Sequence, residues 1–232
     1  VFMKSLKLAG VETHVADSKT CCLHPASTTH RQMTDAELEA ERSHDKFVML
    51  EYAKRQEKRQ NWSEAIRAYK SAGDQGVESA YYHAGIIADN MQSYRKAANL
   101  YKLGYKMGDE WCAYRLGCLY YYKQISGLFA DSKARRCLLY AARKGIPNAQ
   151  SKYAVYLIEH NRNIEASENS GEFWLMCALL NCDQEASDVI RKIRSGFTEN
   201  ALEYYDKRMF EIKHYIIENR PEYIPNYRKS CE

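Results

Sequence analysis

Residues 65–85, AIRAYKSAGDQGVESAYYHAG, share a spaced set of small and aromatic residues with 97–117, AANLYKLGYKMGDEWCAYRLG, which follow after a step of 32. The shared positions are Ala65, Tyr69, Ala72, Gly76, Ala80 and Gly85, matched by Ala97, Tyr101, Gly104, Gly108, Cys112 and Gly117. Two further steps of 37 meet Ala134, Leu138, Ala141, Gly145, Ala149 and Ala154, and then Gly171, Leu175, Ala178, Cys182, Ala186 and Arg191, where the last position has lost its small residue. Periods of roughly 20–50 residues are typical of stacked repeats that cannot bury their apolar faces alone. We therefore predict an all-α protein, an α-solenoid of helical hairpins.

The spacing inside each block predicts where its helices turn. Steps of four and three residues place the first marks on one side of a helix, where small residues let a neighbouring helix approach. Gly76, Gly108 and Gly145 follow, and glycine accepts the left-handed conformation that ends helices. The first helix of the next hairpin begins about three residues later. Because a glycine inside a helix costs about 1 kcal/mol relative to alanine, Gly85 and Gly117 predict close helix crossings.

Three motifs carry a resemblance to a known family. They read AYRLGCLY at 113–120, GLFADSKA at 127–134 and YAARKG at 140–145. Together they resemble one copy of the Sel-one-like repeat (SLR), a relative of the tetratricopeptide repeat. The resemblance covers about 62–195, with neighbouring copies that depart from the pattern, and it implies an α-solenoid that binds other proteins. Asp131 is predicted to cap the helix that follows it.

The rest of the chain divides around these repeats. Residues 1–33 have no helical or strand periodicity and are interpreted as a flexible arm. Residues 34–60 are predicted to form an N-terminal capping helix that begins at Thr34, because Thr34 and Glu37 fit a capping box. The repeats occupy 61–195. Residues 196–232 are predicted to hold a C-terminal capping helix and a tail, in which Pro221 and Pro225 prevent the helix from continuing.

Charge and hydropathy bound the classes of partner. The 232 residues contain 34 Lys and Arg against 30 Asp and Glu, a net charge of +4 that is spread along the chain. Nucleic-acid-binding domains more often concentrate basic residues in a stripe, so we predict no nucleic-acid partner. No apolar run approaches the roughly 20 residues that cross a bilayer, and no transmembrane segment is expected.

The eight cysteines allow two interpretations. Cys21 and Cys22, with His24 and His30 nearby, form a candidate zinc site, but adjacent cysteines lack the usual Cys-x-x-Cys spacing, and we predict no metal. Cysteines within the repeats replace Ala or Gly at two marks, which favours packing as small apolar residues over structural disulfides. These are Cys112, Cys118, Cys137, Cys177 and Cys182. This usage favours a cytoplasmic location, and a periplasmic one is the alternative if a signal peptide was removed.

The sequence contains no recognisable catalytic motif. It has no phosphate-binding glycine loop, no Gly-x-Ser-x-Gly elbow and no His-Glu-x-x-His pair. His83 lies beside Tyr82 on a predicted repeat helix, but no nucleophile and base are brought together around it. We therefore predict a protein that is not an enzyme and has no cofactor. A small helical enzyme or secreted effector, with an active site not visible in the sequence, is the alternative.

The 19 tyrosines give the main clue to function. Tyr69 and Tyr101 occupy equivalent marks and are expected in the core, whereas further tyrosines lie on the first helices of successive hairpins. Tyrosine is enriched at protein interfaces, and carboxylates at the starts of these helices would orient a partner. The predicted protein-binding residues are Glu78, Tyr82, Asp89, Glu110, Tyr114 and Tyr121. We expect a scaffold whose protein partner contacts it through basic or mixed residues. Such a scaffold could serve as an immunity protein that neutralises a secreted toxin, or as an adaptor.

Overall fold

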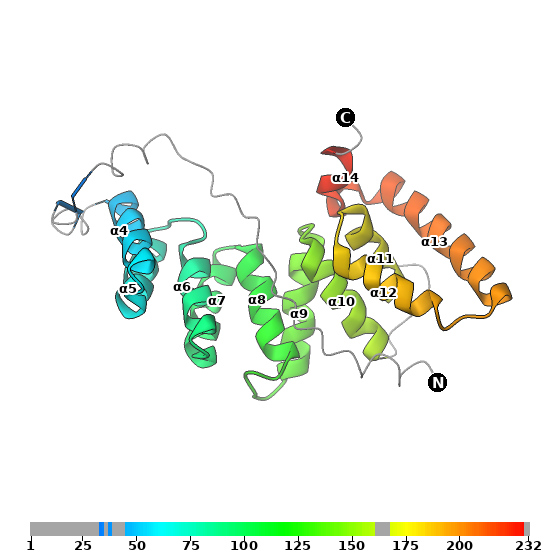
Figure 1. The fold of residues 1–232 in the computed structure, drawn as a ribbon, viewed down its shortest axis with the longest axis horizontal. Coiled ribbons are helices and arrows are strands. Elements are labelled where there is room, and N and C mark those ends of the chain that lie inside the picture. The colour runs from blue at the N-terminus through cyan, green and yellow to red at the C-terminus, as the bar shows by residue number, and fades with distance from the viewer. Residues whose placement is uncertain (1–32, 35–36, 39–44, 161–167, 230–232) are drawn as a thin grey trace. The chain divides into compact units, whose positions relative to one another are not determined.

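The computed structural model describes residues 33–34, 37–38, 45–160 and 168–229. Within these ranges the secondary structure is α-helical apart from one short 3₁₀ helix, and it includes no strand. The described residues divide into two compact units, one up to Ala130 and one from Asp131 onward, and their helices are labelled in Figure 1. The arm predicted at 1–33 lies outside the described residues except for Met33, and the candidate zinc ligands all lie outside them.

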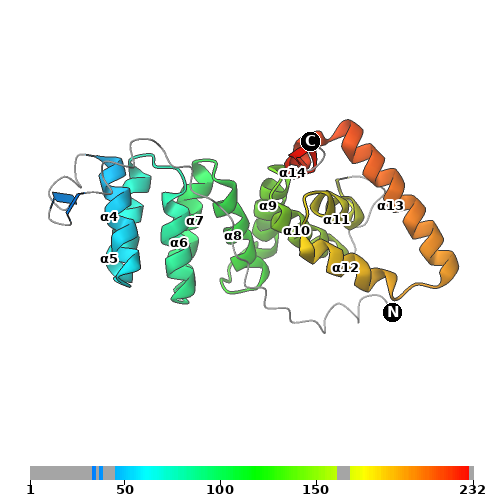
Figure 2. The ribbon, with the colours of Figure 1, turned by 45° about the horizontal axis from the view of Figure 1, so that its top comes forward.

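The first unit is a stack of helices in chain order. It contains α4 (Lys46–Lys58), α5 (Trp62–Asp74), α6 (Ala80–Asn90), α7 (Tyr94–Lys106) and α8 (Glu110–Tyr121). Each helix packs against the next one along the chain, and α6 also contacts α8. Figure 2 shows these helices side by side, from α4 in blue to α8 in green. This is the arrangement of an α-solenoid, as the repeated marks predict.

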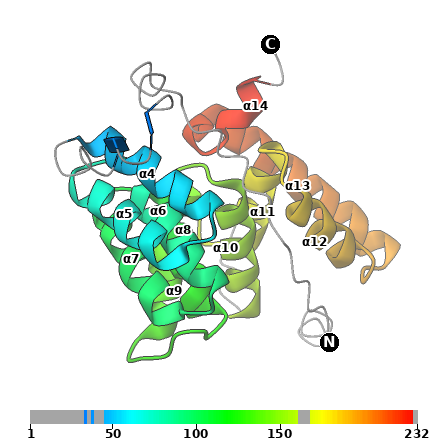
Figure 3. The ribbon, with the colours of Figure 1, turned by 60° about the vertical axis from the view of Figure 1, so that its left-hand side comes forward.

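The second unit continues the helical pattern. It contains α9 (Ala130–Arg143), α10 (Pro147–Glu159), α11 (Gly171–Leu180), α12 (Gln184–Arg194), α13 (Glu199–Asn219), the 3₁₀ helix η1 (Pro221–Tyr223) and α14 (Pro225–Lys229). Helix α11 packs against α10, α12 and α13. Figure 3 shows α13, the predicted C-terminal capping helix, next to α11. It begins after Thr198 and ends before Pro221, as the sequence predicts.

Left-handed residues end the helices where the sequence places glycine. The φ angles are +82°, +92° and +79° at Gly76, Gly108 and Gly145. After Gly76, the amide of Val77 donates to the carbonyl of Ala72 over 3.0 Å, which satisfies a carbonyl at the helix end. In the fourth copy the same position is held by Cys182, whose φ is +63°. The predicted helix ends are therefore confirmed, and one of them forms without glycine.

The capping box predicted at the N-terminal end is present. The amide of Thr34 donates to Glu37 Oε2 over 2.6 Å, and the amide of Glu37 lies 3.4 Å from Thr34 Oγ1. However, the helix predicted over 34–60 is not continuous, because the backbone of Asp45 is extended, with φ −128° and ψ 121°. Helix α4 starts at Lys46, because the Asp45 carboxylate accepts the amide of Phe47 over 2.7 Å and begins a new helix there.

Helix α4 has the register of the repeats rather than that of a separate cap. It lies 32 residues before α6, so that Val48 and Ala53 stand where α6 has Ala80 and Gly85. The two helices also end alike, since Gln60 and Gln92 have φ angles of 60° and 55°. The hairpin pattern of the first unit therefore begins at α4.

Close packing in this unit depends on glycine, as the sequence predicts for Gly85. A Cβ at Gly85 would lie 2.6 Å from Cδ1 of Tyr101, and a Cβ at Gly104 would lie 3.0 Å from Cβ of Cys112. Gly117, the equivalent of Gly85 on α8, is buried. The small marks thus set how near α6, α7 and α8 approach one another.

Two further expectations concern single side chains. Asp131 is not an N-cap, because α9 already begins at Ala130. Its carboxylate instead accepts the hydroxyl of Tyr156 over 2.8 Å and lies 3.2 Å from Nε2 of His160. Among the cysteines of the repeats, Cys112, Cys137 and Cys177 are buried, Cys118 is partly exposed and Cys182 is exposed. Burial raises the pKa of the Cys177 thiol well above its ordinary value, which keeps it protonated and unreactive.

Candidate protein-binding surface

The structure places the six predicted binding residues at very different depths. Tyr82 and Tyr114 are each only 4% exposed, so these two rings are part of the core. Glu78 is exposed, and three others are partly exposed: Asp89, Glu110 and Tyr121. The interpretation of Tyr82 and Tyr114 as solvent-facing anchors therefore does not agree with their burial.

The buried tyrosines belong to a row of aromatic rings that joins α5, α6 and α8. The Tyr69 ring stacks on His83 with centroids 5.3 Å apart, and His83 meets Tyr82 edge-on at 5.8 Å. Tyr82 lies 6.3 Å from Trp111, which lies 6.3 Å from Tyr114. Edge-on and stacked pairs at these distances stabilise by about 0.5–1.5 kcal/mol each beyond their buried area. The row therefore fixes the first helices relative to one another.

Partly exposed residues form a line one position along from the buried tyrosines. They are Ser79, the N-cap residue of α6, with His83 and Ile86 on α6, and Trp111, Arg115 and Cys118 on α8. We call these six residues the first-helix stripe. The first three residues have their equivalents in the last three after the repeat step of 32. Helical spacing places His83 and Ile86 on one face of α6, and Trp111, Arg115 and Cys118 on one face of α8.

The predicted anchors Tyr82 and Tyr114 each stand one position before a partly exposed stripe residue, His83 or Arg115. One residue along a helix turns the side chain by about 100°, which is enough to exchange a core face for a solvent face. The sequence did contain a signal for the stripe, because Trp111 and Arg115, two residue types enriched at interfaces, are four residues apart and share a helix face. Tyrosine content alone pointed to Tyr114 instead.

Asp89 interacts with a core residue, Tyr101, and with a stripe residue, Arg115. Its carboxylate lies 3.5 Å from the hydroxyl of Tyr101, a fully buried residue of α7. Burial raises the pKa of Asp89 above its ordinary value, while the Arg115 guanidinium and the Tyr101 hydroxyl act in the opposite direction. Burial also raises the pKa of Tyr101 strongly, with a further increase from the nearby Asp89 charge. Arg115 of the stripe therefore interacts electrostatically with Asp89, a carboxylate that is partly withdrawn from water.

The remaining predicted residues lie at the two ends of the same helices. Glu110 is in the first turn of α8, after Asp109, whose carboxylate accepts the amides of Trp111 and Cys112 over 2.8 and 3.0 Å. At the other end of α8, Tyr121 meets Tyr122 edge-on at 5.0 Å, and Tyr122 is 50% exposed. Glu110 therefore adds negative charge at one end of the stripe and Tyr122 adds aromatic surface at the other.

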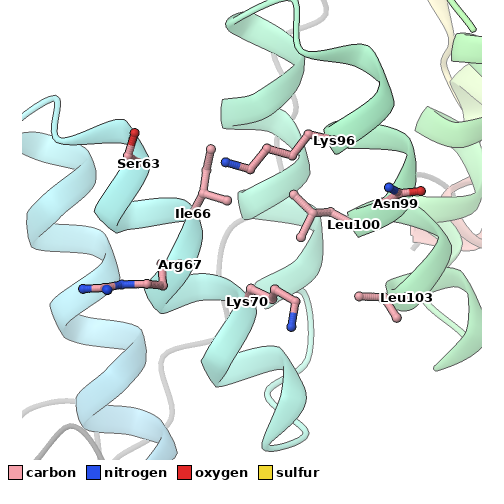
Figure 4. A pocket seen from close by; sticks show the side chains of 8 residues that line it. All are labelled: Ser63, Ile66, Arg67, Lys70, Lys96, Asn99, Leu100 and Leu103. Carbon is pink, nitrogen blue, oxygen red and sulfur yellow. The ribbon is translucent and has the colours of Figure 1, made fainter.

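A separate hollow lies between α5 and α7, with a volume of about 320 Å³. Its apolar lining comes from Ile66, Leu100 and Leu103, and Lys70 and Lys96 bring positive charge. Figure 4 shows the Lys96 side chain extending from α7 toward Ile66. Lys70 is paired with Asp74 over 2.8 Å, so its charge is partly neutralised. The hollow is thus a shallow apolar depression with a basic rim.

The described part of the chain shows neither a metal-binding cluster nor a membrane-spanning helix. Among those residues, no group of three or more His, Cys, Asp or Glu side chains is placed to hold a metal ion. None of the helices described combines the length and the apolar character that crossing a membrane requires.

Comparison with known proteins identifies the fold. No protein-family model matches the sequence, and no curated protein matches it. Among solved structures, the chain is similar to a protective antigen present in uropathogenic Escherichia coli strains that displays an SLR fold, with a TM-score of 0.64 and 17% sequence identity. The match covers 88% of this chain and 43% of the antigen, so the chain spans less than half of that protein's length. The chain has the Sel-one-like repeat fold.

Proposed function

We propose that this protein is a non-enzymatic scaffold that binds another protein along the first-helix stripe. The observation that supports this proposal is the stripe itself, in which partly exposed residues recur at equivalent positions of α6 and α8. A surface built from equivalent positions of stacked helices extends along the stack, as the binding surfaces of solenoids do. The SLR fold supports the same general role.

The chemistry of the stripe indicates a partner with mixed charges and an apolar anchor. Trp111 offers a large aromatic surface, and Ile86 and Cys118 add apolar area beside it. Arg115 is positive, whereas Glu78 and Glu110 are negative and stand at the starts of the two helices. Aromatic and arginine residues dominate binding energy at interfaces, and the surrounding charges orient the partner.

The proposed biological role is that of an immunity protein or an adaptor. An immunity protein that neutralises a secreted toxin needs a fixed surface complementary to one protein, and this surface lies on rigidly packed helices. An adaptor uses the same kind of surface to position its partner. The two roles differ in the partner, so identification of the partner distinguishes them.

The proposal is tested by capture, identification and reconstitution. The tagged full chain is used to capture partners from cells of the source organism, the captured proteins are identified by mass spectrometry, and the strongest partner is purified. Its affinity is then measured by isothermal titration calorimetry against wild type and the variant His83→Ala/Arg115→Ala. We expect binding at least tenfold weaker, because truncation of a central interface residue commonly costs about 2 kcal/mol or more.

A matched variant on the opposite helices controls for effects of charge removal. Lys96→Ala/Lys102→Ala changes two exposed cations of α7 that are not in the stripe. It is expected to bind like wild type, and thermal melting shows whether both variants remain folded. Equal affinity of wild type and a well-folded His83→Ala/Arg115→Ala variant would place the binding surface elsewhere.

A further inference from the structure

The chain after α13 turns back and lies against the second unit. Pro221 ends α13, and residues 220–227 follow in a short 3₁₀ helix and the start of α14. We call this stretch the C-terminal segment. Within it Tyr223 and Ile224 are 8% and 1% exposed, although neither belongs to a repeat helix. Figure 1 shows α14, in red, beside the end of α11.

Two buried amide side chains hold the backbone of the C-terminal segment. Gln150 of α10 and Asn181 at the end of α11 both donate to the carbonyl oxygen of Tyr223, over 2.7 and 2.8 Å. Asn181 also donates to Oε1 of Gln150 over 2.9 Å and accepts the amide of Asn226 over 3.1 Å. Gln150 is 0% and Asn181 3% exposed. The pair therefore forms a preorganised clamp for one carbonyl and one amide of a peptide backbone.

Aromatic and apolar contacts hold the side chains of the same segment. The Tyr223 ring lies 5.3 Å from Trp174 and 6.4 Å from Phe173, both fully buried residues of α11. Its hydroxyl donates to Glu168 Oε1 over 2.9 Å. Pro225 packs over Gly145, where a Cβ would lie 2.8 Å from Pro225 Cγ. The site thus has an aromatic pocket with a polar end and a flat glycine surface for a proline.

We propose that the C-terminal segment is an intramolecular ligand, and that the site beneath it binds aromatic–aliphatic–proline peptides when the segment leaves. Side-chain amides that pair with the backbone of a short segment outside the repeat helices, next to pockets for alternate side chains, are the features of a peptide-recognition site. This inference concerns the second unit and does not depend on the first-helix stripe.

The clamp also determines which kind of ligand can bind in place of the C-terminal segment. When Tyr223 leaves, the Nδ2 group of Asn181 loses a backbone acceptor and its Oδ1 atom loses the amide of Asn226. Asn181 Nδ2 keeps its bond to Gln150 Oε1, and Gln150 Nε2 keeps its bond to the carbonyl of Ala142. A ligand that covered the site without replacing the lost bonds would bury unpaired polar groups, at a cost of about 1–3 kcal/mol each. A partner peptide that supplies a carbonyl and an amide at the same spacing restores these bonds. The open site therefore selects for a peptide that presents a carbonyl and an amide at this spacing rather than for a purely apolar ligand.

The test separates the C-terminal segment from the folded chain without removing it during folding. A protease recognition sequence is inserted between Asn219 and Arg220 of the full chain, which is folded, purified and then cleaved. Circular dichroism follows the helical content before and after cleavage. A fluorescein-labelled peptide of residues 220–232, with Cys231→Ser to prevent oxidation, is titrated with cleaved and with uncut protein in an anisotropy assay.

The expected result is that the cleaved chain stays helical and binds or exchanges the labelled peptide one to one, while the uncut chain binds it at least tenfold more weakly. A peptide with Tyr223→Ala and Ile224→Ala is expected to bind at least tenfold more weakly than the wild-type peptide, and a scrambled peptide serves as control. Loss of helical structure on cleavage, or no uptake of the peptide within a day, would show that the segment is core. Equal uptake by uncut chain would show that the peptide binds somewhere else.

Discussion

The ring of Tyr101 on α7 lies directly over Gly85 of α6, with no space for a side chain between them. A Cβ on Gly85 would be 2.6 Å from Cδ1 and 2.8 Å from Cζ of a ring that is fully buried. We predict that Gly85→Ala lowers the free energy of unfolding by about 1–3 kcal/mol, because overpacking a filled core forces side chains or helices to move. Urea denaturation followed by circular dichroism measures the change.

A double-mutant cycle distinguishes this clash from a general intolerance of α6. Tyr101→Ala removes the ring that a Cβ at Gly85 would meet, so Gly85→Ala should cost less in that background than in wild type. Ser79→Ala, at the partly exposed start of α6, is expected to change stability by less than about 0.5 kcal/mol. An equal cost of Gly85→Ala in both backgrounds would mean that Tyr101 is not the obstacle.

Cys182 adopts the left-handed conformation that the other copies give to glycine. Its φ is +63°, its side chain is exposed, and the amide of Asp183 donates to the carbonyl of Ala178 over 2.9 Å. A residue with a Cβ costs about 1–2 kcal/mol in this conformation. We predict that Cys182→Gly raises the free energy of unfolding by about 1 kcal/mol, as measured by urea denaturation.

The matched control for this prediction keeps the Cβ and removes the thiol. Cys182→Ala should remain within about 0.5 kcal/mol of wild type, because alanine has the same backbone restriction. If alanine stabilises as much as glycine, the effect comes from loss of the thiol and not from the backbone.

The sequence predicted the helical stack because the information was local and periodic. Small residues recur where helices cross, and Gly76, Gly108 and Gly145 recur where they end, so spacing alone located the hairpins. The exposed face was harder to predict. Its position depends on the rotation of each helix against two neighbours, and an error of one residue exchanges Tyr82 for His83.

The docking of the C-terminal segment could not be predicted from the sequence. Pro221 and Pro225 correctly ended α13, but the partners of Tyr223 lie far away in the chain, 73 residues for Gln150 and 42 for Asn181. Such pairs leave no periodic pattern in one sequence. Gln150 gave only a weak signal, as a polar residue where the two preceding copies have Tyr81 and Ala113.

A buried ion pair joins α10 to α12. The Lys152 side chain is 9% exposed and pairs with Glu185, which is 23% exposed. We predict that Glu185→Gln lowers the free energy of unfolding by about 1–3 kcal/mol, because it leaves a nearly buried cation with a weaker partner. The double variant Lys152→Met/Glu185→Leu should lie closer to wild type than Glu185→Gln does.

An exposed pair on the same helix provides the comparison. Arg191 and Asp188 pair over 2.9 Å with side chains 73% and 55% exposed. Asp188→Asn should therefore change stability by no more than about 0.5 kcal/mol. A cost of Glu185→Gln as small as that of Asp188→Asn would show that burial adds nothing to the Lys152 pair.

Asp89 is predicted to make stability depend on pH. Burial raises its pKa, with the Arg115 guanidinium and the Tyr101 hydroxyl opposing that shift. Because the folded pKa exceeds the unfolded value of about 3.9, the folded state holds the proton more tightly. The stability that Asp89 contributes is therefore complete below the unfolded pKa and is lost as the pH rises through the folded pKa.

The variant Asp89→Asn keeps an oxygen acceptor for Tyr101 but does not ionise. It is expected to have a larger free energy of unfolding than wild type at pH 7, and the difference should shrink toward zero as the pH falls to about 4. Urea denaturation at several pH values measures it. In an Arg115→Met background the difference at pH 7 should widen, because the cation that favours the charged carboxylate is gone. A difference that stays constant from pH 7 to pH 4 would mean that ionisation of Asp89 is not its cause.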